Sequence, residues 1–189
     1  STGGHILYLY DDPERYEENA AAYLISGALA GEIPILIEAC ERLGRIRGRI
    51  ARELNKEQQA GIVYIDAEHF YESGNGFGHR RVSERGAKLL EPFAAAQSAV
   101  RIWAHALRVE EEGAGQELDS FERLVDRSVT EFRLLSVCAY EAGMIPASLQ
   151  IKMMRTHDYI MTDEELAVSA FAESGRRSSA SSPDERREF

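Results

Sequence analysis

The sequence predicts an α/β protein in which a parallel sheet is covered by helices on both faces. Three observations lead to this prediction. Five short apolar runs alternate with segments of helical periodicity, and this alternation is typical of parallel sheets. Most of the runs are continuously apolar rather than alternating, as in strands that are buried on both faces. The runs lie at residues 6–10, 34–37, 62–65, 100–103 and 134–138.

The segments between these runs have the spacing of amphipathic helices. Asp12 can cap the first helix, and Pro13 suits its first position because the missing N–H has no partner there. Apolar stripes follow at 16–28, 43–54 and 118–132. The segment 83–96 contains Pro92, so we expect it to kink or to split into two helices. Pro146 begins a further helix, and the segment 162–165 is a capping box for a last one.

Composition excludes several classes of protein. The chain has 189 residues and a formal net charge of −10, from 22 basic and 32 acidic residues. This acidity argues against wrapping nucleic acid or adhering to an anionic membrane. No apolar run approaches the roughly 20 residues of a membrane span. Two cysteines and no signal pattern make a cytoplasmic protein without disulfides the default expectation.

The length suits one domain with a complete core, and we expect it to cover residues 1–170. The remaining residues, 171–189, contain equal numbers of basic and acidic side chains, so the negative charge belongs to the folded part. Their serine-rich stretch has almost nothing to bury. We therefore expect a disordered polar tail or a linker.

Candidate ligand-binding residues follow the predicted strands, because open parallel sheets bind ligands at the carboxyl ends of their strands. Carboxylates, histidines, a cysteine and tyrosines gather at these positions. They are Tyr10, Asp11, Glu38, Cys40, Asp66, His69, His105, Tyr140 and Glu141. Asp66, Glu68, His69 and His105 also carry metal-ligating atoms, but no close pair such as His-x-x-x-His fixes them on one helix face. We expect neither a metal nor a cofactor at this site.

The first strand-to-helix turn is unsuited to phosphate. A phosphate-binding loop needs glycines, a lysine and a serine or threonine. The turn at residues 11–15 contains no glycine or lysine, and its two aspartates would repel phosphate. The glycine-rich stretch at 74–78 is expected to be a flexible surface loop or a lid instead.

The second predicted helix carries four arginines on one stripe, at spacings of three and four residues: Arg42, Arg45, Arg49 and Arg52. On an acidic protein such a stripe could bind an acidic partner or an anion. The alternative is a solvated face whose arginines pair with nearby carboxylates.

Several segments together resemble the MEDS domain, a sensory domain of methanogen and methylotroph proteins and of a dichloromethane-responsive repressor. The matching segments, in chain order, lie at residues 4–10, 27–32, 65–68, 100–102, 121–124 and 135–140. The segments 103–105 and 157–163 are similar to a Bacillus-type branch of this family, which implies a bacterial protein. One departure is that Ala104 and His105 stand where many members carry Gly-Glu, so a ligand role of that glutamate does not transfer to His105.

The resemblance implies a three-layer RecA-like fold without a P-loop, related to the circadian-clock ATPases but lacking their nucleotide chemistry. It also implies a non-catalytic sensory domain that binds a small molecule such as a hydrocarbon derivative. The output would be a histidine kinase, a transcription regulator or another signalling protein. Two alternatives stay open: a docking module that uses the arginine stripe, and a degenerate ATPase or hydrolase.

Overall fold

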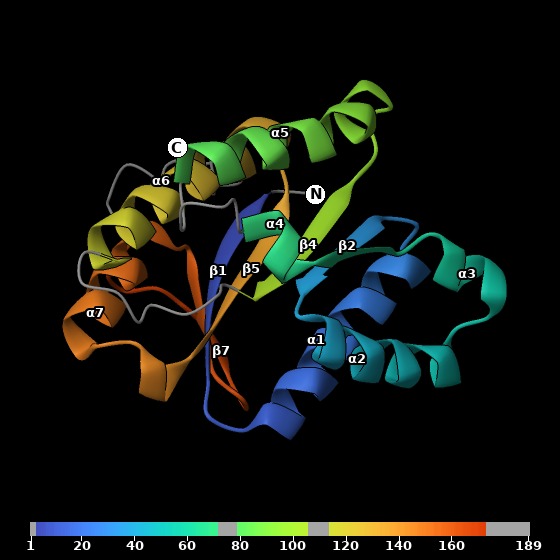
Figure 1. Ribbon diagram of the computed structural model, residues 1–189, viewed down its shortest axis with the longest axis horizontal. Helices are drawn as coiled ribbons and strands as arrows, with labels where there is room; N and C mark the ends of the chain where they lie inside the picture. The colour runs from blue at the N-terminus through green and yellow to red at the C-terminus, as the bar shows by residue number, and fades with distance from the viewer. Residues whose placement is uncertain (1–2, 72–78, 106–113, 173–189) are drawn as a thin grey trace, which may run out of the picture.

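The computed structural model describes residues 3–71, 79–105 and 114–172, which form one seven-stranded sheet with helices on both faces (Figure 1). The strands are β1 (Gly4–Tyr10), β2 (Ile33–Glu38), β3 (Val63–Asp66), β4 (Val100–His105), β5 (Leu135–Glu141), β6 (Tyr159–Met161) and β7 (Leu166–Val168). The helices are α1 (Pro13–Leu29), α2 (Cys40–Glu53), α3 (Lys56–Ala60), α4 (Ala67–Tyr71), α5 (His79–Ala95), α6 (Ala114–Phe132) and α7 (Ala147–Thr156), with a short 3-10 turn at Ala142–Met144.

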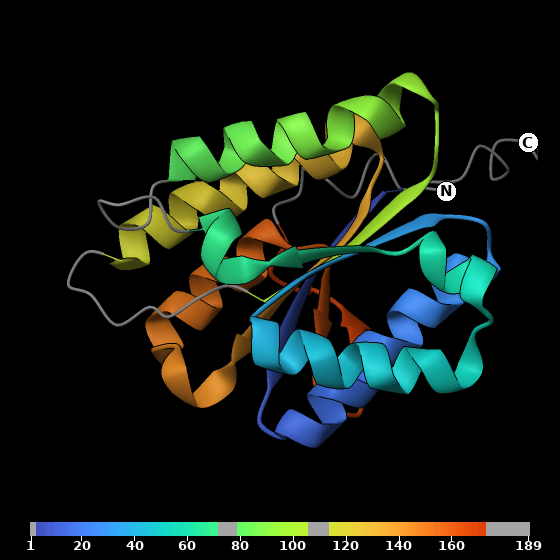
Figure 2. The ribbon, with the colours of Figure 1, turned by 45° about the vertical axis from the view of Figure 1, so that its right-hand side comes forward.

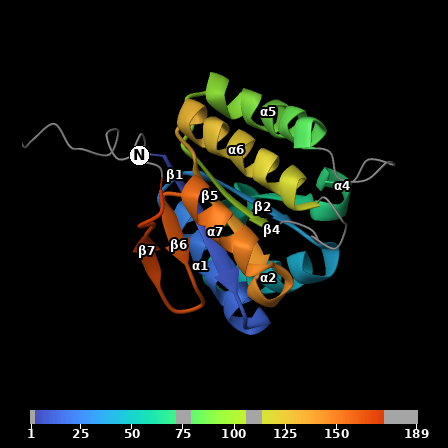
Figure 3. The same ribbon diagram turned by 90° about the vertical axis from the view of Figure 1, so that its left-hand side faces the viewer.

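The sheet has the order β3-β2-β4-β5-β1-β6-β7, and every neighbouring pair is parallel except β6 and β7. The five predicted strands are all present. The predicted helix beginning at Thr162 is wrong, because residues 162–165 are the turn of the β6–β7 hairpin at the sheet edge (Figure 3). In this turn the backbone N–H of Thr162 donates to the carbonyl of Glu165, and the N–H of Glu165 donates to the Thr162 hydroxyl.

Two apolar cores lie on the two faces of the sheet. One face packs against α1 and α2 through residues such as Tyr16, Leu24 and Ile50. The other packs against α4, α5, α6 and α7, including Phe121 and Met153. The turned view shows α5 and α6 side by side above the sheet and α1 and α2 below it (Figure 2). The chain therefore has the predicted three layers.

Local signals explain several helix boundaries. The Asp12 side chain accepts hydrogen bonds from the backbone N–H groups of Glu14 and Arg15, and Pro13 is the first residue of α1, as predicted. The unpredicted helix α3 has a capping box formed by Asn55 and Gln58. Of the kink or split expected at Pro92, the split does not occur. Helix α5 continues through this proline and ends at Ala95, three residues later. Because the proline lies in the last turn, only a short part of the helix follows the backbone hydrogen bond that it removes.

Two predicted segments lie outside the described residues. They are the glycine-rich stretch at 74–78 and nearly all of the polar tail. Within the described part of the chain, no helix combines the length and apolar character that crossing a membrane requires.

Candidate functional site

Polar side chains converge where β1, β2 and β4 end, on the sheet face that α1 and α2 cover. The chain leaves β2 for α2 on this face but leaves the neighbouring β4 for α6 on the opposite face. Such a reversal between adjacent strands is where open α/β sheets form a crevice for ligands. Glu38 and His105, the last residues of β2 and β4, stand on either side of it.

The carboxylate of Glu38 is the centre of this cluster. It is fully buried and accepts hydrogen bonds from the Tyr16 hydroxyl at 2.5 Å and from the backbone N–H of Ala39 at 2.8 Å. Nδ1 of His105 lies 3.2 Å from Oε1, and Nη1 of Arg42 lies 3.8 Å from Oε2. Burial acts to raise the pKa of Glu38, but the close His105 ring and the hydrogen bonds from Tyr16 and Ala39 outweigh it and hold the pKa below its usual value. Glu38 is therefore a stabilised anion.

A ring of hydrogen-bonding side chains surrounds this anion. Nε2 of His105 lies 2.9 Å from the Tyr10 hydroxyl, which also accepts from Arg42 at 3.2 Å. The indole N–H of Trp103 donates to the Tyr16 hydroxyl at 2.9 Å, and the Arg42 guanidinium lies 4.8 Å from the centre of the Tyr16 ring. The polar side chains of the cluster thus form most of their hydrogen bonds with one another.

The structure brings only some of the predicted ligand-binding residues together. Tyr10, Glu38 and His105 form the cluster just described. Cys40 and Asp66 form a separate exposed contact, in which the thiol donates to the carboxylate at 3.2 Å. Three others are exposed without joining the cluster: Asp11, His69 and Glu141. Tyr140 is buried on the opposite face of the sheet and donates to Glu122 of α6.

The turn between β1 and α1 already holds a carboxylate. Oδ2 of Asp163, from the β6–β7 turn, accepts from the backbone N–H groups of both Asp11 and Asp12 at 3.0 Å. Its Oδ1 accepts from the Tyr8 hydroxyl at 2.6 Å. Backbone N–H groups at this turn are the ones that bind phosphate in nucleotide-binding relatives of the architecture. In this protein they bind a side chain of the same chain.

The predicted arginine stripe of α2 is largely paired within the molecule. Arg42 belongs to the Glu38 cluster. Arg45 contacts Glu17 at 2.6 Å and Glu41 at 2.8 Å. Arg49 lies 3.5–3.7 Å from three carboxylates of α1, namely those of Glu14, Glu17 and Glu18. Arg52 is exposed in the last turn of the helix. The stripe mainly joins α2 to α1.

The sequence reasoning missed three residues of this region. The sequence pattern places Tyr16 only in the apolar stripe of a helix and Trp103 only in a strand, and it gives no signal for the hydrogen bonds of their polar atoms. The sequence pattern places Asp163 in a helix cap. The neighbouring Thr162 and Glu165 have the spacing of a helix cap, but the same residues also suit a tight turn between strands, so the local pattern does not distinguish a helix from a hairpin.

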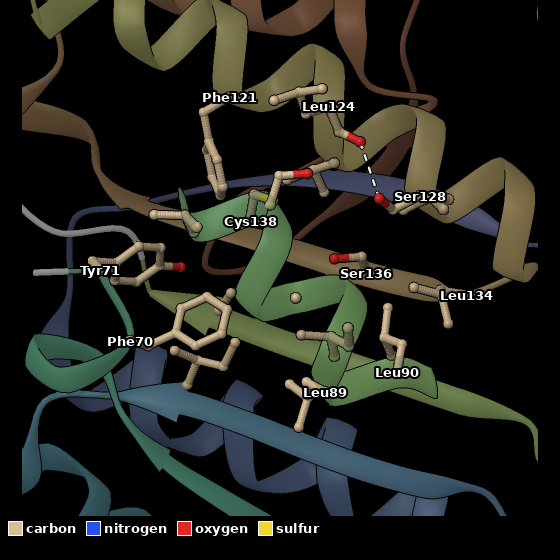
Figure 4. A pocket seen from close by; sticks show the side chains of 18 residues that line it. Phe70, Tyr71, Leu89, Leu90, Phe121, Leu124, Ser128, Leu134, Ser136 and Cys138 are labelled. Atoms are coloured by element: carbon tan, nitrogen blue, oxygen red, sulfur yellow. Dashed lines mark hydrogen bonds between the residues drawn. The ribbon is translucent and has the colours of Figure 1, made fainter. Parts of the chain in front are cut away.

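An apolar cavity lies on the opposite face of the sheet, beneath α5 and α6. Its volume is about 70 Å³. Carbon atoms dominate its walls, and Figure 4 shows Phe70, Tyr71, Leu89, Leu90 and Phe121 around it. The polar atoms among the lining side chains include the hydroxyls of Ser128 and Ser136 and the thiol of Cys138. Of these, Ser128 donates to the carbonyl of Leu124 within its own helix.

Comparisons with known proteins agree with this architecture. The family model described as "MEDS: MEthanogen/methylotroph, DcmR Sensory domain" matches residues 4–158. The crystal structure of a KaiC-like protein from the hyperthermophilic archaeon Pyrococcus horikoshii OT3 is similar, with a TM-score of 0.57 and 16% sequence identity. The similarity covers 85% of this chain and 72% of that one, and shows a shared RecA-like fold. The search of curated proteins found no match.

Proposed function

The chain belongs to the MEDS family of sensory domains, and from this premise we propose that it binds a small apolar molecule in the cavity beneath α5 and α6. The observation that carries the proposal is the cavity itself, which is lined mainly by carbon. Such a lining favours a ligand without charge or many hydrogen-bonding groups, because polar groups would lose their bonds to water there.

The size of the cavity limits the ligand. Engineered apolar cavities of about 150 Å³ bind benzene. The volume here, about 70 Å³, suits a smaller compound such as a halogenated methane. The hydroxyl of Ser136, on β5, is among the polar groups that orient it.

The strand-end cluster supports a non-catalytic role. Glu38 accepts hydrogen bonds from Tyr16 and Ala39, and Asp163 takes the backbone donors of the first turn. To bind at the first turn, a nucleotide would have to displace the Asp163 carboxylate from the backbone N–H groups of Asp11 and Asp12. ATP turnover by the purified chain that disappears in a Glu38→Gln variant would contradict this part of the proposal.

We further propose that occupancy of the cavity is transmitted to a signalling partner, such as a histidine kinase or a transcription regulator. Support comes from the sensory family and from the cavity walls, which include two long helices, α5 and α6. A ligand that fits one arrangement of these helices better than another would shift the population between them. The pairing of Arg45 and Arg49 within the molecule favours sensing over docking through the arginine stripe.

A methyl NMR titration with dichloromethane tests the binding site. We expect shift changes centred on the lining methyl groups of Val82, Leu90, Val125 and Val129. Ser136→Val fills part of the cavity with a side chain suited to a strand, and should abolish these changes. The matched control is Ser148→Val, at an exposed position of α7, which should retain them. Changes of equal size in both variants, or changes confined to the strand-end cluster, would refute the cavity as the site.

A further inference from the structure

Four potential metal ligands meet inside the protein, on the sheet face that α6 and α7 cover. His5 lies on β1, Cys138 on β5 and Glu122 on α6, and His157 directly follows α7. One donor atom from each residue lies within 4.8 Å of all the others. The side chains of the two histidines and of Glu122 are fully buried, and Cys138 is 3% exposed. Segments that are far apart in the sequence therefore place nitrogen, oxygen and sulfur ligands around one point.

The outer nitrogen of each imidazole ring bonds to the backbone. Nδ1 of His5 lies 3.1 Å from the carbonyl oxygen of Thr156, and Nδ1 of His157 lies 2.7 Å from that of Met153. A carbonyl oxygen only accepts, so each Nδ1 carries the hydrogen and donates it. In the neutral rings, both Nε2 atoms then present lone pairs toward the centre of the group. Metal-binding histidines are oriented by the same bond from the second ring nitrogen to a carbonyl.

When both rings are neutral, the inner atoms are thus mostly acceptors that face one another. Nε2 of His5 and Nε2 of His157 each lie 3.3 Å from Oε2 of Glu122. Neither that Oε2 nor Nε2 of His157 has a hydrogen-bond partner among the described residues, although both atoms are buried. Buried acceptors pointing at one another repel unless a cation or a proton lies between them.

Three of the six spacings among these four atoms suit a tetrahedral metal centre, and none of the six exceeds 4.8 Å. Zinc bonds of about 2.0–2.3 Å place neighbouring ligand atoms roughly 3.3–3.8 Å apart. Three of the distances between ligand atoms are 3.3 Å, including that from Nε2 of His5 to Sγ of Cys138. The second oxygen of Glu122 accepts from the Tyr140 hydroxyl, a bond that orients the carboxylate as hydrogen bonds to metal-binding carboxylates do.

We propose that His5, Glu122, Cys138 and His157 form a structural site for Zn²⁺ or a similar divalent cation. Four protein ligands leave no open coordination position, as in structural rather than catalytic zinc sites. Binding converts the Cys138 thiol to a thiolate and releases its proton to solvent. The two negative charges of the thiolate and the carboxylate then balance the divalent cation, so the buried group becomes neutral. The bound metal joins α6 and the segment after α7 to the two central strands β1 and β5.

Cobalt substitution of the full chain tests the site. After chelator treatment and dialysis, addition of Co²⁺ should produce tetrahedral visible bands and a thiolate charge-transfer band at one equivalent, and Zn²⁺ should displace both. Cys138→Ala should lose the charge-transfer band, whereas Cys40→Ser, which alters the exposed cysteine on the other side of the sheet, should retain it. Tyr140→Phe should keep the band but lower Co²⁺ affinity by roughly 10–100-fold.

X-ray absorption of the zinc-loaded wild type gives a result that does not depend on a variant folding. The proposal requires one sulfur ligand and three nitrogen or oxygen ligands. An absence of sulfur, a wild type that binds no Co²⁺, or a band that is lost in Cys40→Ser but kept in Cys138→Ala would overturn it. In the first two cases the four side chains share protons rather than a metal.

Discussion

At the residue scale, Glu38 shows how a buried carboxylate can remain ionised. Removing a carboxylate from water is costly unless donors replace the lost hydration. Tyr16 and the backbone of Ala39 donate to it, while His105 and Arg42 lie close to it. Only Glu38 itself, with His105 and Tyr10, was predicted from the sequence as part of a common site. Tyr16 and Trp103 could not be predicted, because an apolar stripe or strand does not reveal which hydroxyl or indole N–H finds a polar neighbour.

Glu38→Gln should destabilise the fold near neutral pH and have less effect in acid. The amide removes the charge and leaves donors around it unmatched, which we expect to lower the free energy of unfolding by about 2–4 kcal/mol. The pKa of Glu38 is lowered by folding, so its ionisation stabilises the protein above the unfolded value of about 4.3. That contribution disappears as the pH falls through the lower pKa of the folded state.

Urea unfolding of both proteins at several pH values measures this effect. The difference between wild type and Glu38→Gln should shrink steadily as the pH falls below about 4. The control is Glu57→Gln, at an exposed position of α3, whose difference from wild type should stay small throughout. A Glu38→Gln difference that is independent of pH would mean that shape, rather than charge, determines the effect.

At the scale of single elements, the junction of α1 and α2 combines apolar packing with ion pairs. Ile46 and Ile50 of α2 are buried, and Arg45 and Arg49 reach across to one buried and two exposed carboxylates of α1. The sequence predicted both helices and the arginine stripe. It left open whether the arginines face a partner or their own chain, because that depends on how the two helices lie beside each other.

Gly48→Ala should stabilise α2 and therefore the whole protein. Gly48 lies inside the helix at an exposed position, and an added Cβ would meet no atom within 4 Å. Alanine loses less backbone entropy than glycine on entering a helix, so the free energy of unfolding should rise by about 0.5–1 kcal/mol. Thermal and urea unfolding would measure this gain.

Gly27→Ala is the contrasting substitution in α1. There the added Cβ would overlap the side chain of Arg101, which is held by Glu32 and by the carbonyl of Tyr23. We expect a loss of stability despite the same gain in helix propensity. Equal effects of the two substitutions would show that packing around Gly27 can yield to the new methyl group.

At the scale of the whole molecule, the sequence predicted the layers but not the edge of the sheet. Five strands and most helices followed from local periodicity, which operates over a few neighbouring residues. The β6–β7 hairpin did not, because its strands have only three residues each and Thr162 and Glu165 mimic a helix cap. Contacts such as that of Asp163 with Asp11 join residues about 150 positions apart, and no local pattern encodes them.

Asp163→Asn should loosen the hairpin and leave the centre of the sheet intact. The Asp163 carboxylate accepts from the backbone of Asp11 and Asp12 and from the Tyr8 hydroxyl, and an amide has too few acceptor positions for all three. Losing a charge-assisted bond should cost about 1–3 kcal/mol. Because β6 pairs with β1 through only three residues, the cost should appear first as local opening of β6 and β7.

Hydrogen exchange should then accelerate in residues 159–168 while the β2–β4 amides keep their protection. The control is Glu164→Gln, in the same turn, which should leave hydrogen exchange unchanged both in residues 159–168 and in the β2–β4 amides. Uniform acceleration across the sheet would instead mean that the hairpin and the central strands unfold as one cooperative unit.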